Sequence, residues 1–465
     1  MAAAPFPEQP SLRRELGWKD GALITIGATL GTSIFLTPAD IAAAIPHAGL
    51  ILAAWAVGGV LTLCGALTYA ELGTMYPRAG GPYHFLKEAY GPLWGFLFGW
   101  ASFLVIMSGG IAAIAAGFGE YLGSFVPFFS TQNVLFSAPL GVGRWTANGG
   151  QVAGALAILL LTVVNFFGVR QGAALQNLFT IAKLGALGAL AVFGLLATPR
   201  ATPDLAAPLP AGDFLPAFGV ALIAILWAYD GWYEFTFSGG EVKDPPRNLP
   251  RGLILGALGL LVIYGVLNLV YLRAMTVEQI AKTPRIAEGA AHVFFGPGAA
   301  RLVTAAILVS IFGALSANIL CCARIYQPMA QDGLFFRQLA RIHPRYRTPT
   351  ASLTAQGIWS AILVVSGTYA QLFTYVVFVG LLFFAATGVG LYVLRRTRPD
   401  ASRPYRTWGY PVVPALFILA SLGIAINTVI ERPTESLVGL GIIVLGLPAY
   451  AFWRARRREE SAIQD

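Results

Sequence analysis

The chain has 465 residues, of which 56% are hydrophobic and only 11% are charged. Soluble globular proteins average about 25% charged residues, so this composition excludes an ordinary soluble domain and indicates a protein with many membrane spans. The net charge of +9 would suit a nucleic-acid partner, but the Lys and Arg residues cluster in alternate loops between apolar runs. That distribution indicates orientation in a membrane, and no nucleic-acid partner is expected.

The apolar runs predict an all-α integral membrane protein with twelve transmembrane helices in contact with the lipid bilayer. The excess of Lys and Arg in the loops of one side predicts that both termini are cytoplasmic, and the cell membrane, here a bacterial inner membrane, is the expected location. The expected spans cover residues 19–45, 49–76, 92–121, 150–169, 173–197, 215–240, 250–272, 300–328, 350–367, 371–394, 411–430 and 436–454.

The first span is interrupted by glycines and hydroxyl side chains between Gly27 and Phe35. Glycine costs roughly 1 kcal/mol against alanine in a helix interior, and non-helical backbone at membrane depth is tolerated only where it is buried in protein or lines a water-filled cavity. We therefore predict a discontinuous helix, broken near Thr29 to Thr32, whose break is a binding site. The alternative is a seam of small residues that packs closely against another helix.

A second apolar segment is interrupted between Trp227 and Trp232. Two broken segments in corresponding places of two halves indicate the substrate site of a secondary transporter. The half-helix that starts at Thr32 and Ser33 offers free N–H groups and a partial positive charge, which suit a carboxylate. Free carbonyl groups near Ile26, Gly27, Leu226 and Trp227 suit an ammonium group, so the zwitterionic head of an amino acid fits both breaks.

Lys183 lies about eleven residues, or roughly 16 Å, inside the fifth span, which is too deep for its side chain to reach the interface easily. A charged residue at this depth is a functional hypothesis by default. Its amine, placed among backbone carbonyls, would do what a bound sodium ion does, and Ser316 and Asn318 of the eighth span are candidates to meet it. The alternative is a lysine that only joins helices through carbonyls.

Three further residues have two interpretations each. Asp230 in the second break either caps the inner half-helix or contacts a substrate amine. Trp227 either packs between helices or closes over the substrate as a gate. Glu71, near the cytoplasmic end of the second span, forms a structural ion pair or takes part in transport.

The chain resembles the amino acid-polyamine-organocation superfamily, and most closely its L-type amino acid transporter branch. The resemblance covers nearly the whole chain in order, through the residues at 27–35, 65–73, 77–83, 175–184, 227–232, 241–250, 323–326, 332–334, 403–406 and 409–411. It implies a five-plus-five inverted repeat with discontinuous helices 1 and 6, followed by two extra helices, and alternating access around the paired breaks. The implied parts are a tail at 1–18, repeats at 19–197 and 198–395, the last two spans at 396–454 and a tail at 455–465.

The resemblance also implies that Trp227 is an aromatic gate, that Lys183 stands in place of a sodium ion, and that Thr32 and Ser33 bind the substrate carboxylate. The animal members of the branch have a cysteine in the outer loop after span three for a disulfide to a glycoprotein, and residues 122–148 contain none. No disulfide-linked heavy chain is therefore expected. Asp230 stands where those members have a glycine, so neutral amino acids and substrates with amine or cationic groups both stay open.

The expected function is sodium-independent transport of neutral L-amino acids, by exchange or uniport. The alternative is a proton-coupled amino acid or amine/polyamine permease that uses Lys183 as its proton site. An enzyme is not expected, because the four histidines lie outside the spans or at their ends, and a nutrient-sensing receptor would need longer tails. No cofactor or metal is expected, and the oligomeric state is not predicted. The candidate substrate-binding residues are Ile26, Gly27, Thr29, Gly31, Thr32, Ser33, Trp227, Ala228 and Asp230, with Lys183 and Ser316 as the coupling pair.

Overall fold

The computed structural model describes residues 14–140, 143–167, 169–205, 207–209, 214–346 and 348–462. The first part of the chain forms α1 (Trp18–Thr29), α2 (Ser33–Ala44), α3 (Ala48–Met75), α4 (Pro82–Tyr90), α5 (Pro92–Ala101), the π-helical turn η1 (Ser102–Ile106), α6 (Met107–Leu122), the 3₁₀ turn η2 (Pro127–Phe129), the strands β1 (Val134–Leu140) and β2 (Gly143–Asn148), α7 (Gly149–Phe166) and α8 (Val169–Leu196).

The second part forms α9 (Leu215–Tyr229), the 3₁₀ turns η3 (Glu234–Phe237) and η4 (Gly239–Glu241), α10 (Pro245–Ala274), α11 (Val277–Ala281), α12 (Ile286–Phe295), α13 (Pro297–Gln331), the 3₁₀ turn η5 (Arg337–Ala340), α14 (Thr350–Ser366), α15 (Tyr369–Thr397), α16 (Val412–Glu431) and α17 (Pro433–Ala462).

Helices occupy all twelve intervals that the sequence predicts as spans. Among the described residues, eight helices are long and apolar enough to cross a membrane, or nine when α1 and α2 count as one bent span. The apolar parts of α8, α9 and α14, which occupy the other three intervals, are shorter. The chain is thus a multi-pass membrane protein, and the layout of twelve spans stays a prediction.

The predicted break in the first span is confirmed. Helix α1 ends at Thr29, α2 begins at Ser33, and the two are bent by 51° at the three residues between them. The second break follows Tyr229, where Gly231 takes a φ of +103°, a left-handed conformation that favours glycine.

Beyond the second break, the predicted inner half-helix up to residue 240 is wrong. The chain forms only the two short 3₁₀ turns η3 and η4. Ser238, Gly239 and Gly240 stand between or within these turns. Serine and especially glycine are poorer helix formers than alanine, which gives the physical reason for the loss of a continuous helix.

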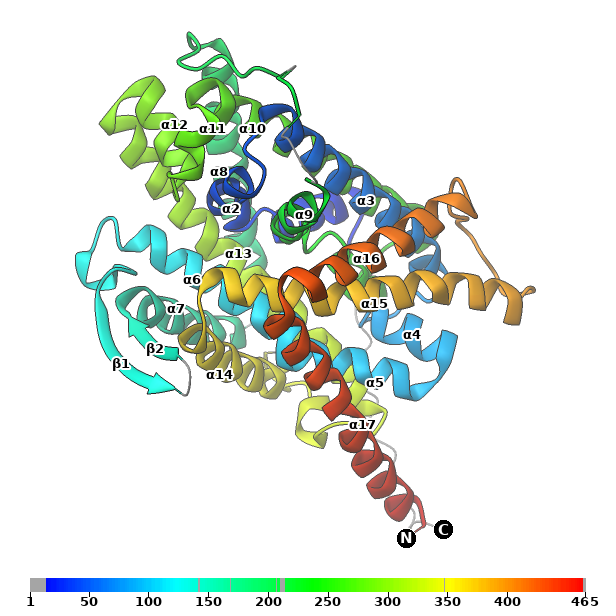
Figure 1. Ribbon diagram of the computed structural model, residues 1–465. Helices are drawn as coiled ribbons and strands as arrows, with labels where there is room; N and C mark the ends of the chain where they lie inside the picture. The colour runs from blue at the N-terminus through cyan, green and yellow to red at the C-terminus, as the bar shows by residue number, and fades with distance from the viewer. Residues whose placement is uncertain are drawn as a thin grey trace.

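Helix α9 lies in the centre of the bundle (Figure 1) and packs against α2, α3, α15 and α16. Helix α1 packs along α10, and α10 packs along α3. Both breaks therefore lie in the interior of the molecule, where irregular backbone is surrounded by protein and not by lipid.

The expectation of an all-α chain has one exception. Residues 134–140 and 143–148 form an antiparallel hairpin, β1 and β2, at the left of Figure 1. Aromatic residues favour strands, and Phe136 and Trp145 face each other here with ring centroids 5.8 Å apart. Trp145 also donates a hydrogen bond to the carbonyl of Val365 at the end of α14 (3.0 Å), so the hairpin is tied to the bundle.

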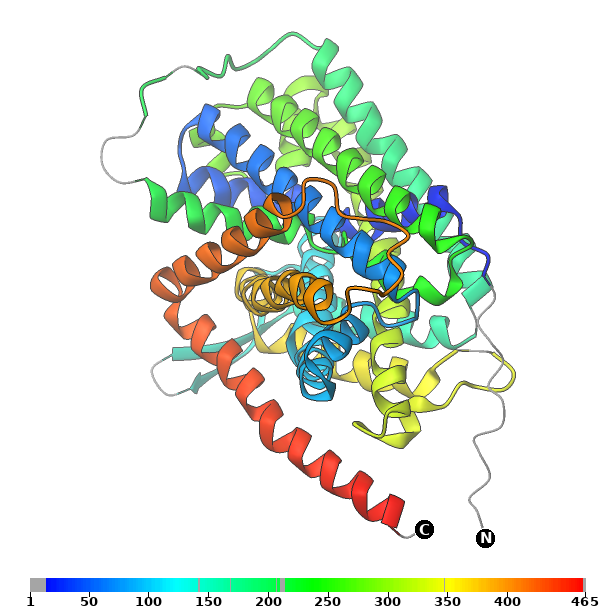
Figure 2. The ribbon, with the colours of Figure 1, turned by 90° about the vertical axis from the view of Figure 1, so that its right-hand side faces the viewer.

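The interpretation of Glu71 as part of an ion pair is confirmed. Glu71 is fully buried on α3 and accepts hydrogen bonds from Arg395 Nε (2.9 Å) and a terminal nitrogen of Arg395 (2.7 Å). The backbone N–H of Thr407 also donates to Glu71 (2.7 Å). Figure 2 shows the orange loop between α15 and α16, which contains Thr407, crossing over α3. Glu71 thus joins three separate segments of the chain.

Candidate functional site

A small cavity lies between the two breaks. Its walls come from four places in the chain: the first break, the helix that runs through η1 and α6, the second break and α13. The lining residues are Ala28, Thr29, Gly31, Thr32 and Ser33; Ile106, Met107, Gly110 and Ile114; Trp227, Asp230, Gly231 and Glu234; and Asn318.

Six of the nine residues predicted to bind substrate line this cavity, namely Thr29, Gly31, Thr32, Ser33, Trp227 and Asp230. The other three lie beside it and serve the scaffold. Ile26 packs towards Gly259 of α10, Gly27 accepts a hydrogen bond from Lys183, and Ala228 accepts one from Tyr264 (2.6 Å).

The sequence analysis did not predict several residues of the cavity. For two of them, Gly110 and Glu234, the sequence contains a feature that could have indicated a role at the site. Gly110 belongs to the run of small residues Ser108-Gly109-Gly110, which allows either another helix or a ligand to approach. A Cβ added at Gly110 would lie 3.9 Å from the ring of Trp227. Glu234 is a carboxylate within a predicted span, and residues of that kind are functional candidates by default.

The start of α2 faces the cavity with backbone donors. Thr32 is the cap residue of this helix, and no side chain caps it. The first N–H groups of any helix have no partner within the helix, and they carry a partial positive charge. Since Thr32 and Ser33 line the cavity, this helix end provides the kind of site that binds a carboxylate.

Lys183 of α8 contacts the first break but does not line the cavity. The side chain is buried, and its ammonium group donates hydrogen bonds to the carbonyls of Gly27 (3.0 Å) and Leu30. Leu30 is the first residue after α1. The lysine therefore places a positive charge on the carbonyls at the broken end of the helix.

The carbonyl groups at the breaks are less free than expected. The carbonyl of Ile26 accepts a hydrogen bond from the N–H of Leu30 (2.9 Å), and that of Trp227 accepts one from the N–H of Asp230 (3.1 Å). The helices end at Thr29 and Tyr229, and the residues that follow them, Leu30 and Asp230, are the donors to these carbonyls. A carbonyl oxygen has two lone pairs, so each of these groups can still accept a second hydrogen bond.

Ser316 does not meet Lys183, which corrects the expected coupling pair. Its hydroxyl and carbonyl oxygens both accept from the amide of Asn165 on α7 (3.3 Å each). The residue of α13 that lines a small cavity together with Lys183 is Ser310. Six residues separate the two serines, which is roughly 9 Å along a helix and places them on different faces. Asn318, the other candidate, donates to its own helix at Ala314 and lines the main cavity.

One face of the bundle carries β1 and β2 and the opposite face carries α4 (Figure 1); we call them the hairpin side and the α4 side. A wide vestibule opens on the hairpin side, and Trp145 and Tyr369 are among its lining residues. The indole N–H of Trp227 donates to the hydroxyl of Tyr369 (2.9 Å), which also contacts the hydroxyl of Thr32 (3.3 Å). These three side chains separate the vestibule from the cavity.

More contacts close the cavity towards the α4 side than towards the vestibule. Arg324 of α13 forms an ion pair with Glu241 of η4 (3.0 Å), and the N–H groups of Glu15 and Leu16 donate to the carbonyl of Glu241 (2.8 and 3.0 Å). The buried ring of Phe235 lies against glycines of α1 and α10. The cavity is therefore closed on both sides, with the thinner barrier towards the vestibule.

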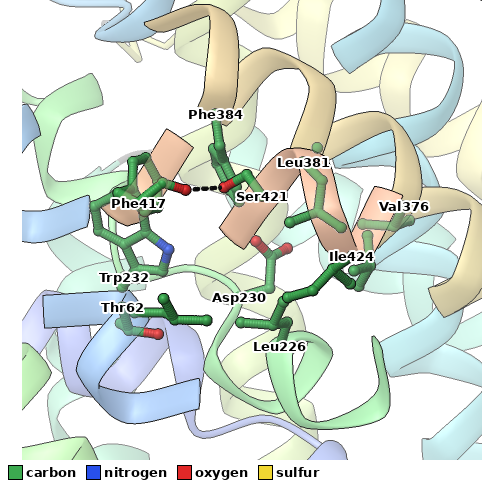
Figure 3. A pocket seen from close by; sticks show the side chains of 13 residues that line it. Thr62, Leu226, Asp230, Trp232, Val376, Leu381, Phe384, Phe417, Ser421 and Ile424 are labelled. Atoms are coloured by element: carbon green, nitrogen blue, oxygen red, sulfur yellow. Dashed lines mark hydrogen bonds between the residues drawn. The ribbon is translucent and has the colours of Figure 1, made fainter. Parts of the chain in front are cut away.

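Asp230 stands between the cavity and a second, mostly apolar cavity (Figure 3). In this view its carboxyl group points away from Leu226, into the space bordered by Ser421, Leu381 and Ile424. Asp230 does not cap a helix, because η3 begins four residues later, with Tyr233 as its cap residue. The other interpretation, contact with a substrate amine, stays a prediction.

No group of three or more His, Cys, Asp or Glu side chains that could hold a metal ion occurs among the residues described. The site therefore offers helix ends, one buried ammonium group, an aromatic barrier and two carboxyl groups. These groups are suited to binding a small polar molecule with charges of both signs.

A family model for amino acid permeases matches residues 16–447. The chain belongs to the amino acid permease family. It is 30% identical over 453 residues to the serine/threonine exchanger SteT of Bacillus subtilis (strain 168), with 97% of this chain and 99% of the relative covered. It is 32% identical over 452 residues to the b(0,+)-type amino acid transporter 1 of Homo sapiens, covering 96% of this chain and 88% of the relative.

A third relative is the large neutral amino acids transporter small subunit 2 of Mus musculus, 29% identical over 456 residues, with 96% of this permease and 82% of the relative covered. The resemblance seen in the sequence is thus confirmed at the level of the family, and amino acid transport is the activity that these names support. Their near-complete coverage means that the cavity lies within the shared region.

Proposed function

We propose that this permease is a sodium-independent amino acid transporter, either an exchanger or a uniporter, that works by alternating access around the cavity between the two breaks. The observation that carries the proposal is the ammonium group of Lys183 on the carbonyls of Gly27 and Leu30. A positive charge already stabilises the broken end of α1 there, so a sodium ion has no electrostatic task left at this point.

In this proposal the substrate binds through its zwitterionic head. Its carboxylate accepts hydrogen bonds from the first N–H groups of α2 at Thr32 and Ser33, and its ammonium group uses the remaining lone pairs of the carbonyls at the breaks. The relatives support an amino acid as substrate, since their names describe a serine/threonine exchanger, a b(0,+)-type transporter and a large neutral amino acid transporter subunit.

The vestibule would be the extracellular entrance and the α4 side the cytoplasmic exit, in a bacterial inner membrane with both termini inside. Parting of Trp227 from Tyr369 opens the cavity to the vestibule, and loss of the Arg324 to Glu241 ion pair is one step in opening the other side. The two five-span repeats at residues 19–197 and 198–395 would move against each other. No disulfide-linked heavy chain is proposed, because residues 122–148 contain no cysteine.

The test is uptake of radiolabelled amino acids into proteoliposomes at zero sodium, with and without unlabelled amino acid inside. Uptake that needs internal substrate and ignores an imposed pH gradient supports an exchanger, and uptake into empty vesicles without a gradient supports a uniporter. Uptake that requires sodium refutes the proposal.

A proton-coupled amino acid or amine permease is the second candidate, favoured by the burial of Lys183 without a carboxylate in hydrogen-bonding contact among the residues described. Lys183 would release its proton during the cycle. Uptake into empty vesicles that is driven by the pH gradient, and that is lost in Lys183→Met, would establish this candidate in place of the first.

A further inference from the structure

Glu234 is a buried carboxyl group in the wall of the substrate cavity. It is the first residue of η3, its side chain is 3% exposed, and its N–H donates to the carbonyl of Gly231 at the second break (3.0 Å). The cavity that it lines is the one bordered by Thr32, Ser33 and Trp227. A negative group thus lies in the same enclosed space as the proposed site for the amino acid head.

One oxygen of this carboxyl group, Oε2, has no hydrogen-bond partner within the described part of the chain. Nearly all buried polar atoms in proteins are paired, and an isolated buried charge is strongly unfavourable. An unpaired buried oxygen in the wall of a ligand cavity therefore indicates that the ligand supplies the partner.

The cations on neighbouring elements are engaged elsewhere. Lys183 donates to Gly27 and Leu30 at the first break, and Arg324 of α13 is paired with Glu241 at 3.0 Å. Helices α1 and α10 also pack against η3, but Lys19 on α1 and Arg251 on α10 are exposed. None of these four side chains is shown bonded to Glu234.

Asp230 is the other carboxyl group at this break, and it borders the same cavity. Figure 3 shows its carboxyl group directed into the apolar second cavity. Its neighbours there are mainly aliphatic and aromatic side chains, and as an acid it brings no cation that could pair with Glu234. A cationic group on the ligand would therefore lie near two carboxyl groups at this break, whereas a neutral side chain offers them no charge.

We propose that Glu234 is a specificity-determining residue that binds a second cationic group on the substrate, the ammonium or guanidinium group of an amino acid side chain. This inference rests on the proposed function, in which the breaks bind the amino acid head. An amino acid with a neutral side chain leaves Oε2 unpaired, whereas one with a cationic side chain provides a charge-assisted donor. Glu234 therefore favours cationic over neutral amino acids of the same shape.

The experiment measures equilibrium binding to the purified full-length protein for two matched pairs, lysine with norleucine and arginine with citrulline. Each pair has a similar shape, and only one member has a cationic side chain. The wild type is expected to bind the cationic member more tightly. Glu234→Gln should weaken lysine and arginine at least about tenfold and leave norleucine and citrulline within about threefold of the wild type, because it removes one charge-assisted hydrogen bond. Glu278→Gln, the same change at an exposed position of α11, is the control.

Equal loss of lysine and norleucine binding in Glu234→Gln overturns the inference, and so does an unchanged ratio of the two affinities. If Glu234→Gln does not fold, Glu234→Asp and the wild-type selectivity decide: equal affinity of the wild type for lysine and norleucine also overturns it. Binding or uptake of neutral amino acids that persists in these cases leaves the proposed function standing. Absence of any amino acid binding or uptake in the wild type refutes the proposed function instead.

Discussion

The hydroxyl group of Tyr369 is predicted to hold the barrier between vestibule and cavity closed. It accepts from the indole of Trp227 at 2.9 Å and contacts the hydroxyl of Thr32 at 3.3 Å, so one oxygen atom joins α15 to both breaks. Tyr369→Phe removes only this oxygen. The ring keeps its edge-to-face contact with Phe373, whose centroid is 5.4 Å away.

The expected magnitude follows from the two contacts. A hydrogen bond contributes about 0.5–1.5 kcal/mol net, so loss of two shifts the equilibrium between closed and open barrier by about 1–3 kcal/mol, which is about 5–150-fold. The contact to Thr32 is long, which favours the lower part of this range. We expect the open population to rise about tenfold.

The assay uses a cysteine at position 110 as a reporter. Gly110 lines the cavity, and a Cβ placed there would be 3.9 Å from Trp227, an ordinary contact distance. The three natural cysteines are buried. The rate at which a membrane-impermeant thiol reagent modifies Gly110→Cys from the vestibule should rise about tenfold when Tyr369→Phe is added.

Tyr375→Phe is the matched control, because it removes a hydroxyl from the same helix at a position that does not line the vestibule or the cavity. The reasoning is refuted if Tyr369→Phe leaves the modification rate unchanged, or if Tyr375→Phe raises it as much. Either result would mean that the hydrogen bonds of the Tyr369 hydroxyl group do not hold the barrier closed.

Three further predictions concern the lysine, the buried ion pair and one histidine. Lys183→Met leaves the carbonyls of Gly27 and Leu30 without their donor. We expect at least about tenfold weaker amino acid binding in this variant and retention of binding in Lys183→Arg. Unchanged binding by Lys183→Met in proteoliposomes would contradict the proposed role of the lysine. Glu71→Gln should lower the free energy of unfolding by about 3–5 kcal/mol, because it leaves buried charge unpaired. This loss would be measured as a lower melting temperature in detergent. The control is Glu88→Gln, which removes a more exposed ion pair with Arg398 and should cost no more than about 1 kcal/mol. Burial, aided by the charge of Lys87, lowers the pKa of His84 from 6.5 to about 4. As the pH falls, the unfolded chain therefore takes up a proton at His84 before the folded protein does, so the stabilising contribution of neutral His84 is complete above pH 6.5 and decreases towards pH 4 by at most about 1.4 kcal/mol per pH unit. His84→Phe should show a shallower fall of melting temperature with decreasing pH.

The sequence determined those features that depend on local composition. The low share of charged residues identified a membrane protein, and glycines and hydroxyl side chains in the first span located the break between Thr29 and Ser33. A helix is destabilised by its own residues at such a point, so no knowledge of its neighbours is required. The depth of Lys183 in its span indicated a role in the interior of the protein, because a charged side chain at that depth is unfavourable in contact with lipid.

Only the tertiary structure decided which groups meet. Lys183 is joined to Gly27 and Leu30 across more than 150 residues, Trp227 to Tyr369 across 142, and Ser316 to Asn165 instead of to the lysine. The same holds for Glu234, whose unpaired oxygen has meaning only because the breaks enclose it. Helix periodicity and local propensity do not specify which helix faces rotate towards each other in the bundle; packing of the whole chain does.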